Sequence, residues 1–471
     1  MESFTILGSV LGCSVCVAVG GLVFAAYKLG VFYQLFHKTE TKSPRHGGES
    51  VAEVLRAHGV KFLFTLVGGH ISPILVACEK VGIRVVDTRH EATAVFAADA
   101  VARLSGTVGV AAVTAGPGLT NTVTAVKNAQ MAESPLLLLG GAAATLLQGR
   151  GALQDIDQMS LFKPLCKFCA SIRTVREIVP TLRKALAIAQ SGTPGPVFIE
   201  FPIDTLYPYH LVSQEFAVKN PPKGLMGKFV SWYLNNHLMN LFAGAWETRE
   251  VSPLPVHVPQ ATDDQLQKCI ELLSRAKKPV ILLGSQATLP PTPVEDIRKA
   301  LEDLGVPCFL GGMSRGMLGK DSPIHIRQNR RDALKEADLV LLAGYICVVH
   351  PRVLGVTGLC YFGGQKLKGF GSTGVDWTPV IAVVGNDACW SQISREQVPI
   401  LGSNVACGLF FTDYHTVADG YGGKGYLVGR ENGEQLSDII RKVQKETREG
   451  RATLLNVLIG KTNFREGSIS V

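Results

Sequence analysis

Residues 108–121 read VGVAAVTAGPGLTN, an apolar run that leads into a glycine-rich turn. The unbroken apolar run predicts a strand buried on both faces, which is typical of a parallel sheet covered by helices. A helical pattern follows at 121–131, and other short apolar runs alternate with helical patterns on both sides of this stretch. The chain is therefore predicted to be an α/β protein built on parallel sheets.

The elements around this stretch predict a first domain at 49–205. Its first helix is expected to begin at a capping box, Ser50 to Glu53, and to end at Gly59. The other elements expected there are strands at 62–67, 83–86, 136–139 and 197–202 and helices at 71–80 and 91–104. The rest of the chain divides into a linker at 206–260, a second α/β domain at 261–346, an atypical junction at 347–378 and a short third domain at 379–471.

Composition excludes two classes of protein. Charged residues make up 18% of the chain and hydrophobic residues 46%, so a globally disordered chain is excluded. The net charge of +8 is mild, and no dense run of Lys and Arg with interleaved aromatic residues occurs. The sequence therefore predicts that the protein has no nucleic-acid partner.

Residues 4–26 predict a single-pass membrane anchor. These 23 residues carry no charge, and as a helix they would span about 34 Å, enough for a hydrocarbon core of about 30 Å. The start at Met1-Glu2-Ser3 lacks the positive charge of a cleaved signal peptide, which is the alternative. Basic residues from Lys28 to Arg45 follow the run and predict that the body of the chain faces the cytosol.

A second stretch bears on the lipid bilayer as a partner. Residues 229–246 are rich in aromatic residues and have an amphipathic pattern. Such a stretch fits a helix that lies at the bilayer surface, and it fits equally a helix packed on its own domain.

Three signatures in the first domain together resemble a known family. Gly68-Gly69 follows a strand, Arg89-His90-Glu91 precedes a helix of small residues, and the glycine-rich turn at 114–121 joins a strand to a helix. Their order, with the segments 154–158 and 193–197, is similar to the pyrimidine-binding domain of thiamine-diphosphate enzymes of the acetolactate synthase and 2-hydroxyacyl-CoA lyase group. The resemblance implies a three-domain architecture, with the pyrimidine-binding domain at 49–205, a middle domain at 261–346 and a remnant of the diphosphate-binding domain at 379–471.

The resemblance also implies a catalytic carboxyl group. Glu91 matches the residue that shares a proton with the N1′ nitrogen of the cofactor's aminopyrimidine, and Gly116 matches a cofactor-binding position. Taken alone, Glu91 could equally be an acidic residue stabilised at a helix N-terminus. His70 and Gln154 match positions near the substrate and the thiazolium ring, or are ordinary polar residues at loop ends.

The diphosphate end of the site departs from the family pattern. Gly385-Asn386-Asp387-Ala388 matches the second half of a magnesium motif, with the Asn386 side chain and the Ala388 carbonyl as Mg²⁺ ligands. No Gly-Asp-Gly precedes it, and Asp376 stands too close to Asn386 to leave room for the intervening helix. About 150 residues are therefore expected to be missing, judged against the usual length of the family.

The activity implied is cleavage of 2-hydroxyacyl-CoA to formyl-CoA and a fatty aldehyde shortened by one carbon. Alternatives are acetolactate-synthase-like carboligation and a non-catalytic truncated form that pairs with a full-length enzyme. The resemblance further implies thiamine diphosphate and Mg²⁺ as cofactors, an acyl-CoA substrate, a homodimer or homotetramer, and the endoplasmic reticulum membrane as location. Whether the middle domain holds a nucleotide (FAD or ADP) stays open.

Overall fold

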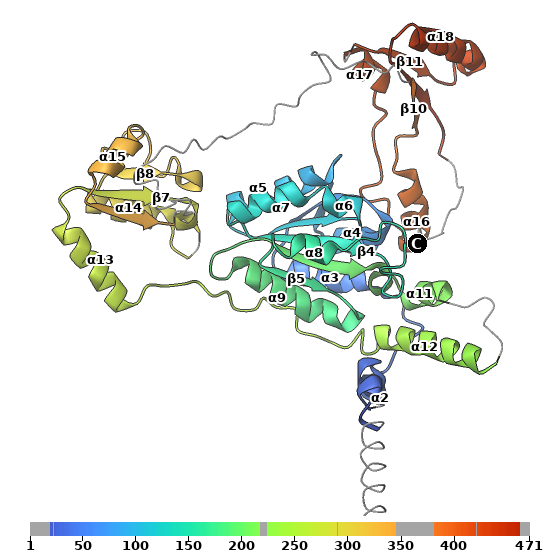
Figure 1. Ribbon diagram of the computed structural model, residues 1–471, viewed down its shortest axis with the longest axis horizontal. Helices are drawn as coiled ribbons and strands as arrows, with labels where there is room; N and C mark the ends of the chain where they lie inside the picture. The colour runs from blue at the N-terminus through green and yellow to red at the C-terminus, as the bar shows by residue number, and fades with distance from the viewer. Residues whose placement is uncertain are drawn as a thin grey trace, which may run out of the picture. The chain divides into compact units, whose positions relative to one another are not determined.

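The computed structural model describes residues 19–216, 224–344 and 381–461, apart from residues 22, 290 and 421 (Figure 1). The chain divides into two compact units between Ile346 and Cys347. The predicted anchor at 4–26 lies mostly outside the described residues, and so does nearly all of the junction at 347–378. Among the helices that are described, none is long and apolar enough to span a bilayer.

The first unit contains a six-stranded sheet in the order β2-β1-β3-β4-β6-β5. All neighbouring strands are parallel. The strands are β1 (Phe62–Leu66), β2 (Arg84–Asp87), β3 (Gly109–Val113), β4 (Leu136–Ala142), β5 (Phe168–Ser171) and β6 (Val197–Pro202). Every residue of β3, β4 and β6 is buried, so the prediction of a parallel sheet covered on both faces is confirmed.

Two groups of helices cover this sheet. On one face, α5 (Glu91–Ser105) packs against α7 (Val123–Met131), and on the other face α3 (Gly47–Ala57) packs against α4 (Ser72–Lys80) and α9 (Ile178–Gln190) (Figure 1). Three short helices complete the domain: α6 (Pro117–Thr120), α8 (Gln158–Phe162) and α10 (Ile203–Leu206).

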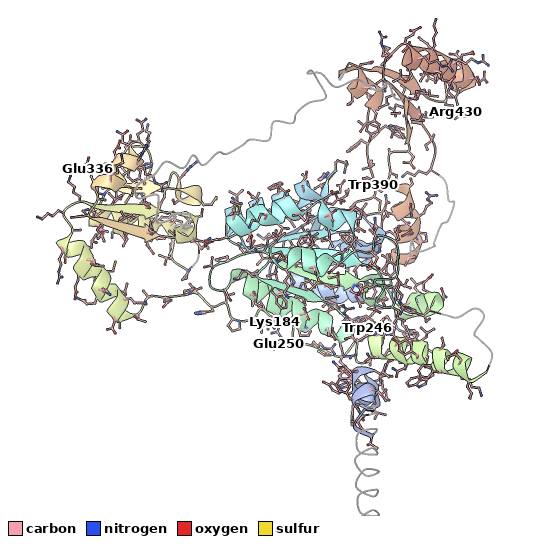
Figure 2. All side chains as sticks on the ribbon, viewed as in Figure 1. Lys184, Trp246, Glu250, Glu336, Trp390 and Arg430 are labelled. Carbon is pink, nitrogen blue, oxygen red and sulfur yellow. The ribbon has the colours of Figure 1, made fainter. Side chains whose placement is uncertain are left out.

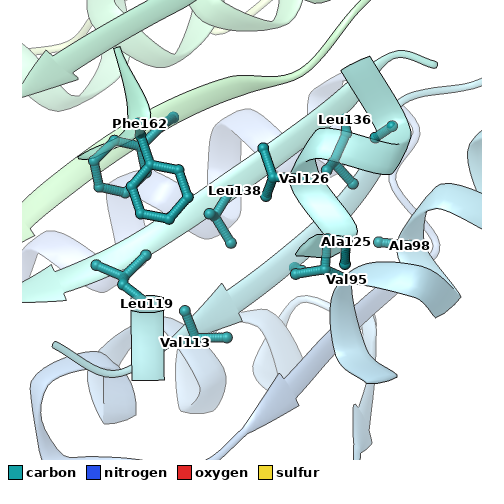
Figure 3. Close-up of a cluster of buried hydrophobic side chains, with 12 residues drawn as sticks. Val95, Ala98, Val113, Leu119, Ala125, Val126, Leu136, Leu138 and Phe162 are labelled. Atoms are coloured by element: carbon teal, nitrogen blue, oxygen red, sulfur yellow. The ribbon is translucent and has the colours of Figure 1, made fainter. Parts of the chain in front are cut away.

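The main core lies between the sheet and the pair α5 and α7 (Figure 3). Val95 of α5 packs there with Val113 of β3 and Leu138 of β4, all fully buried. The rings of Phe162 and Phe198 close one end, with centroids 4.6 Å apart. This packing fixes α5, and with it the residue at the start of that helix, relative to the carboxyl ends of the strands.

The first helix begins earlier than the capping box predicted, so that part of the prediction is wrong. Helix α3 starts at Gly47, and Ser50 lies inside it rather than at its N-cap. A Cβ atom on Gly47 would lie 2.0 Å from the Thr205 carbonyl oxygen, and one on Gly48 would lie 2.3 Å from that of Pro73. Close backbone packing therefore sets the start of α3. Its end agrees with the prediction, since Gly59 follows with φ +72°.

The linker forms two helices, α11 (Tyr209–Glu215) and α12 (Leu225–Phe242), and α12 packs against α2 (Val31–Phe36). Leu238, Leu241 and Phe242 are buried, so the C-terminal half of α12 packs on its own domain. Trp246 lies beyond the end of α12 (Figure 2). The Arg45 guanidinium lies 5.1 Å from the centroid of its ring.

The second α/β domain has a parallel sheet in the order β8-β7-β9. Its elements are β7 (Pro279–Leu283), β8 (Cys308–Leu310), β9 (Leu339–Ala343), α13 (Asp263–Arg275), α14 (Val294–Leu304) and α15 (Arg330–Glu336). Thr262 and Gln265 form a complete capping box at the start of α13, which explains why the helix begins there.

The second unit has a three-stranded parallel sheet in the order β10-β12-β11. Its elements are β10 (Ile381–Asn386), β11 (Lys424–Val428), β12 (Thr453–Leu458), α16 (Ser391–Leu401), α17 (Tyr414–Gly420) and α18 (Leu436–Arg448).

Candidate active site

Glu91 is the first residue of α5 and is 7% exposed. The helix start is capped by His90, whose Nδ1 accepts a hydrogen bond from the Ala92 N–H at 3.2 Å. Asn121 Nδ2 donates to Glu91 Oε2 at 2.9 Å. Glu91 Oε1 makes no hydrogen bond within the described part of the chain, so one oxygen of this buried carboxyl group is held and the other stays free.

The glycine-rich turn passes directly beside this carboxyl group. A Cβ atom on Gly118 would lie 3.7 Å from Glu91 Oε1 and 2.8 Å from Thr114 Cγ2. Gly116 has φ +59° and ψ −111°, and a Cβ atom there would lie 2.6 Å from the Gln154 carbonyl oxygen. Both glycines are therefore needed for close approach, Gly116 also because its backbone angles are disfavoured for other residues.

A network of buried hydrogen bonds connects the glycine-rich turn to the sheet. The Gly116 N–H donates to Gln158 Oε1 at 2.8 Å, and Gln158 Nε2 donates to Glu200 Oε1 at 2.8 Å. The other oxygen of Glu200 accepts from the Ser171 hydroxyl at 2.6 Å. Gln158 and Glu200 are both buried, so this chain of bonds ties the turn to β6 and β5.

His70 and Gln154 meet at Thr114. The Thr114 hydroxyl lies 3.3 Å from His70 Nδ1 and 3.5 Å from Gln154 Oε1. His70 belongs to a short 3₁₀ helix (Gly69–Ile71) after β1, and burial lowers the pKa of its imidazole to about 4. The ring is therefore neutral at neutral pH. Gln154 has φ +61°, an unusual angle for a residue other than glycine.

These residues gather at the carboxyl ends of four neighbouring strands. His70 follows β1, Glu91 follows β2, Thr114 and Gly116 follow β3, and Gln154 follows β4. Ligands of open parallel sheets bind at this edge. Of the residues predicted from the sequence, His70, Glu91, Gly116 and Gln154 all belong to this group.

Three residues that contact the predicted ones were not singled out from the sequence: Thr114, Asn121 and Gln158. All three lie in the segments quoted for the family resemblance, yet their roles depend on partners far along the chain. Asn121, for example, reaches Glu91 over 30 positions. Only the fold could pair them.

The other predicted residues, Asn386 and Ala388, lie after β10 in the second unit. Asn386 is buried, and its Nδ2 donates to the Thr412 carbonyl at 3.1 Å and to Asn456 Oδ1 at 3.2 Å. Its Oδ1 accepts from the Ala388 N–H at 3.3 Å. The Ala388 carbonyl accepts from the Leu409 N–H at 2.9 Å.

These groups do not make a complete Mg²⁺ site. Asn386 Oδ1 and the Ala388 oxygen each accept one hydrogen bond, and the Asp387 carboxylate is held at the start of α16 by bonds from the Cys389 N–H and the Ser391 hydroxyl. No cluster of three or more His, Cys, Asp or Glu that could hold a metal occurs among the described residues. Mg²⁺ needs near-octahedral oxygen ligands, and a carboxylate is the usual protein contribution.

Comparison with known proteins assigns the sequence to a family. Residues 45–161 match the model of the thiamine pyrophosphate enzyme N-terminal TPP binding domain, and residues 266–352 match that of the thiamine pyrophosphate enzyme central domain. The 2-hydroxyacyl-CoA lyase 2 of Danio rerio is 62% identical, in an alignment that covers 98% of this chain and 99% of the relative. The chain belongs to the thiamine pyrophosphate enzyme family.

Other members of the family are similar over different lengths. The 2-hydroxyacyl-CoA lyase 2 of Homo sapiens is 48% identical, with 98% of this chain and 97% of the relative covered. A probable acetolactate synthase of Mycobacterium bovis is 32% identical over 64% of this chain and 48% of its own length. The resemblance noted in the sequence is thus confirmed.

The alignment with the Danio rerio relative is longer than this chain. It runs over 615 positions, whereas the chain has 471 residues, so at least 144 aligned positions have no residue here. Because the alignment covers both proteins almost end to end, the positions without a residue here lie between aligned segments of this chain rather than beyond its ends. This agrees with the internal gap that the missing Gly-Asp-Gly segment suggested.

Proposed function

We propose that this chain carries the pyrimidine-side half of a thiamine-diphosphate lyase that cleaves 2-hydroxyacyl-CoA to formyl-CoA and an aldehyde one carbon shorter. Two relatives with the lyase name, 62% and 48% identical, support the reaction class. The observation that carries the proposal is the buried Glu91 carboxyl group, with Oε2 held by Asn121 and Oε1 free.

Glu91 fits the role of proton donor and acceptor toward the N1′ nitrogen of the cofactor. When bound, thiamine diphosphate supplies a carbon nucleophile for attack on a carbonyl group. Because the Asn121 amide donates to Oε2, a proton on the carboxyl group sits on Oε1. Glu91 can therefore give a proton from Oε1 and take it back without moving.

The neighbouring residues position the reacting groups. His70 is neutral, so its ring offers one donor and one acceptor and adds no charge near a developing anion. The Thr114 hydroxyl orients the Nδ1 side of that ring. Gln158 and Glu200 hold the Gly116 turn against Gln154, which keeps the loop after β4 beside the site.

The second unit leads us to propose a modified role for this particular chain. The described residues there supply an amide oxygen and a carbonyl oxygen for Mg²⁺, and Asp387 is held at the start of α16. At least 144 positions of the alignment with the Danio rerio relative have no residue in this chain. We infer that the chain alone binds the diphosphate weakly. We propose that the chain forms a homodimer or homotetramer. In a mixed assembly with a full-length enzyme, it would lend Glu91 to a site that the full-length partner completes.

Pyruvate carboligation is the second candidate reaction. It is favoured by the match to a probable acetolactate synthase, but that match is 32% identical and covers 64% of the chain. The membrane run at 4–26 suits the long-chain acyl substrate of a lyase better, because such a chain partitions into bilayers. We also propose that the chain lies in the endoplasmic reticulum membrane, as the family resemblance implies. The basic residues from Lys28 to Arg45 support a body that faces the cytosol.

A mixed-assembly assay tests the reaction. The Danio rerio relative, with the counterpart of Glu91 replaced by Gln, is co-reconstituted with this chain and given thiamine diphosphate, Mg²⁺ and 2-hydroxypalmitoyl-CoA. Release of formyl-CoA and a fatty aldehyde supports the proposal. Formation of acetolactate from pyruvate, without aldehyde release, would favour carboligation instead.

A further inference from the structure

Helix α12 presents a row of large apolar side chains to solvent. The apolar face of α12 consists of the exposed residues Leu225, Met226, Phe229, Trp232 and Tyr233. Leu225 is 86% exposed and Trp232 is 48% exposed. Their spacing of three and four residues places them along one side of the helix. Exposed apolar patches of this kind mark interaction surfaces.

The orientation of α12 is fixed by polar contacts with the N-terminal region. Asn236 Nδ2 donates to the Leu29 carbonyl at 3.0 Å, and Gln34 Nε2 donates to Asn236 Oδ1 at 3.2 Å. Thr39 Oγ1 donates to the Met239 carbonyl at 2.9 Å. On the domain side, His237 Nε2 lies 2.9 Å from the Thr145 hydroxyl. The apolar face is therefore held in place rather than free to turn inward.

The N-terminal region that holds α12 is itself apolar on its surface. Phe24, Tyr27 and Phe36 are all more than half exposed. In sequence, this region continues directly from the uncharged run at 4–26. Asn236 and Met239, in the C-terminal half of α12, are thus hydrogen-bonded to a segment that leads into the uncharged run at 4–26.

A hollow lies between α12 and the loop after β4, and Phe229 and Tyr233 of the apolar face contribute to its lining. It has a volume of about 310 Å³ and is lined by apolar side chains of α12, including Phe229 and Leu234, and of the loop after β4, including Leu147. Arg150 is the charged residue of its lining, and its guanidinium has no hydrogen bond or ion pair within the described residues. The size is at the lower end of that of ligand pockets, about 300–1,000 Å³.

The charges on α12 itself and directly before α2 are positive, whereas Glu215 precedes Phe216 of the hollow and Asp155 accepts from the Gly149 N–H. Helix α12 contains Lys228 and no acidic residue, and Lys28 precedes α2. Aromatic and apolar residues on one face, with basic residues beside them, are typical of helices that lie in the interface of an anionic bilayer.

We propose that α12 lies in the plane of an anionic phospholipid bilayer, with its apolar face among the acyl chains, and that the hollow between α12 and the loop after β4 receives one acyl chain of a lipid whose phosphate pairs with Arg150. The proposal rests on the proposed membrane location and is independent of lyase activity. It differs from simple anchoring, because it makes the folded body a second contact with the lipid.

Fluorescence of Trp232 in vesicles tests the position of α12. The full chain with Trp246→Phe, Trp377→Phe and Trp390→Phe keeps Trp232 as its one tryptophan. It is reconstituted in phosphatidylcholine–phosphatidylserine vesicles whose acyl chains are brominated or not. We expect emission about twofold lower in the brominated vesicles, because an interfacial indole lies within reach of the acyl-chain bromines.

Two sets of serine substitutions in that background provide the comparison. Leu225→Ser, Met226→Ser and Phe229→Ser remove most of the apolar face and should abolish the difference. The matched control, Leu266→Ser, Ile270→Ser and Leu272→Ser, changes three exposed apolar residues of α13 and should preserve it. Equal Trp232 emission in both kinds of vesicle, or undiminished quenching in the α12 variant, would overturn the proposal. Failure of the chain to associate with vesicles would overturn the membrane location as well, whereas absence of lyase activity bears on neither.

Photo-crosslinking tests the hollow. Phosphatidylcholine with a diazirine on its acyl chain should label peptides that contain residues 146–150 and 229–234, and Arg150→Glu should reduce that label severalfold while label on residues 19–28 stays constant. Label confined to the N-terminal region, or label at the hollow that excess palmitoyl-CoA removes, would contradict a lipid occupant. The second result would assign the hollow to soluble acyl-CoA.

Discussion

Gln158→Leu should loosen the turn that passes beside Glu91. The substitution removes the acceptor of the Gly116 N–H and the donor to Glu200, two buried contacts of 2.8 Å. A buried N–H left without a partner costs about 1–3 kcal/mol, and a hydrogen bond to a charged group contributes about 1.5–3 kcal/mol. The expected destabilisation of this region is therefore about 2.5–6 kcal/mol.

Hydrogen exchange followed by mass spectrometry measures this effect on the full chain. A loss of 3 kcal/mol corresponds to exchange about 150-fold faster in peptides that cover β3, the turn and β6. Gln214→Leu, at an exposed position of α11, is the matched control and should leave these peptides unchanged. The double variant Gln158→Leu with Glu200→Leu should be less destabilised than the sum of the single variants, because it also removes the buried Glu200 Oε1 that Gln158→Leu leaves without its amide donor. Unchanged exchange in Gln158→Leu, or strict additivity in the double variant, would refute the reasoning.

Three further predictions concern pH, cofactor binding and topology. The pKa of His70 is lowered to about 4 by burial, so the unfolded chain binds more protons than the folded chain between pH 6.5 and 4. The free energy of unfolding therefore falls as the pH is lowered across that window. In thermal unfolding, His70→Gln should lose less stability than the unsubstituted chain over this range, and an unchanged pH profile would contradict this. Calorimetry with thiamine diphosphate and Mg²⁺ should detect weak or no binding to the chain alone, under conditions that saturate the Danio rerio relative. The reason is that this chain has no Gly-Asp-Gly segment to supply a carboxylate ligand for Mg²⁺. Tight binding would show that the second unit has been misinterpreted. Lys320→Asn creates an Asn-Asp-Ser acceptor site in the body of the chain, which should stay unglycosylated in microsomes if the body faces the cytosol, and glycosylation there would reverse the topology.

Much of the fold followed from sequence pattern alone. Because β3, β4 and β6 are buried on both faces, their apolar runs are unbroken and easy to recognise. Strand β5 lies at the sheet edge and is half-buried, so its four residues give no such run and it was missed. The start of α3 was placed wrongly because Gly47 and Gly48 pack against Thr205 and Pro73, which only the folded chain brings near.

The candidate site was predictable to a similar degree. Gly116 and Glu91 stand in local motifs, and the structure places Gly118, in the same turn as Gly116, beside Glu91 Oε1. Asn121 and Gln158 could not be assigned in advance, because their partners lie 30 and 42 positions away. The roles of Glu91, His70, Gly116, Gln154, Asn386 and Ala388 in binding and catalysis stay predictions.

The most direct test of Glu91 as the proton carrier is the turnover of mixed assemblies. This chain, with Glu91 or with Glu91→Gln, is combined with the Danio rerio relative in which the counterpart of Glu91 is Gln, and aldehyde release from 2-hydroxypalmitoyl-CoA is measured. An amide cannot take up or release the N1′ proton, and general acid–base catalysis of this kind contributes about 10²–10⁴-fold. The account predicts that the chain with Glu91 restores turnover and that Glu91→Gln leaves it at least a hundredfold lower. Equal turnover of the two assemblies, at equal extents of association by light scattering, would contradict it.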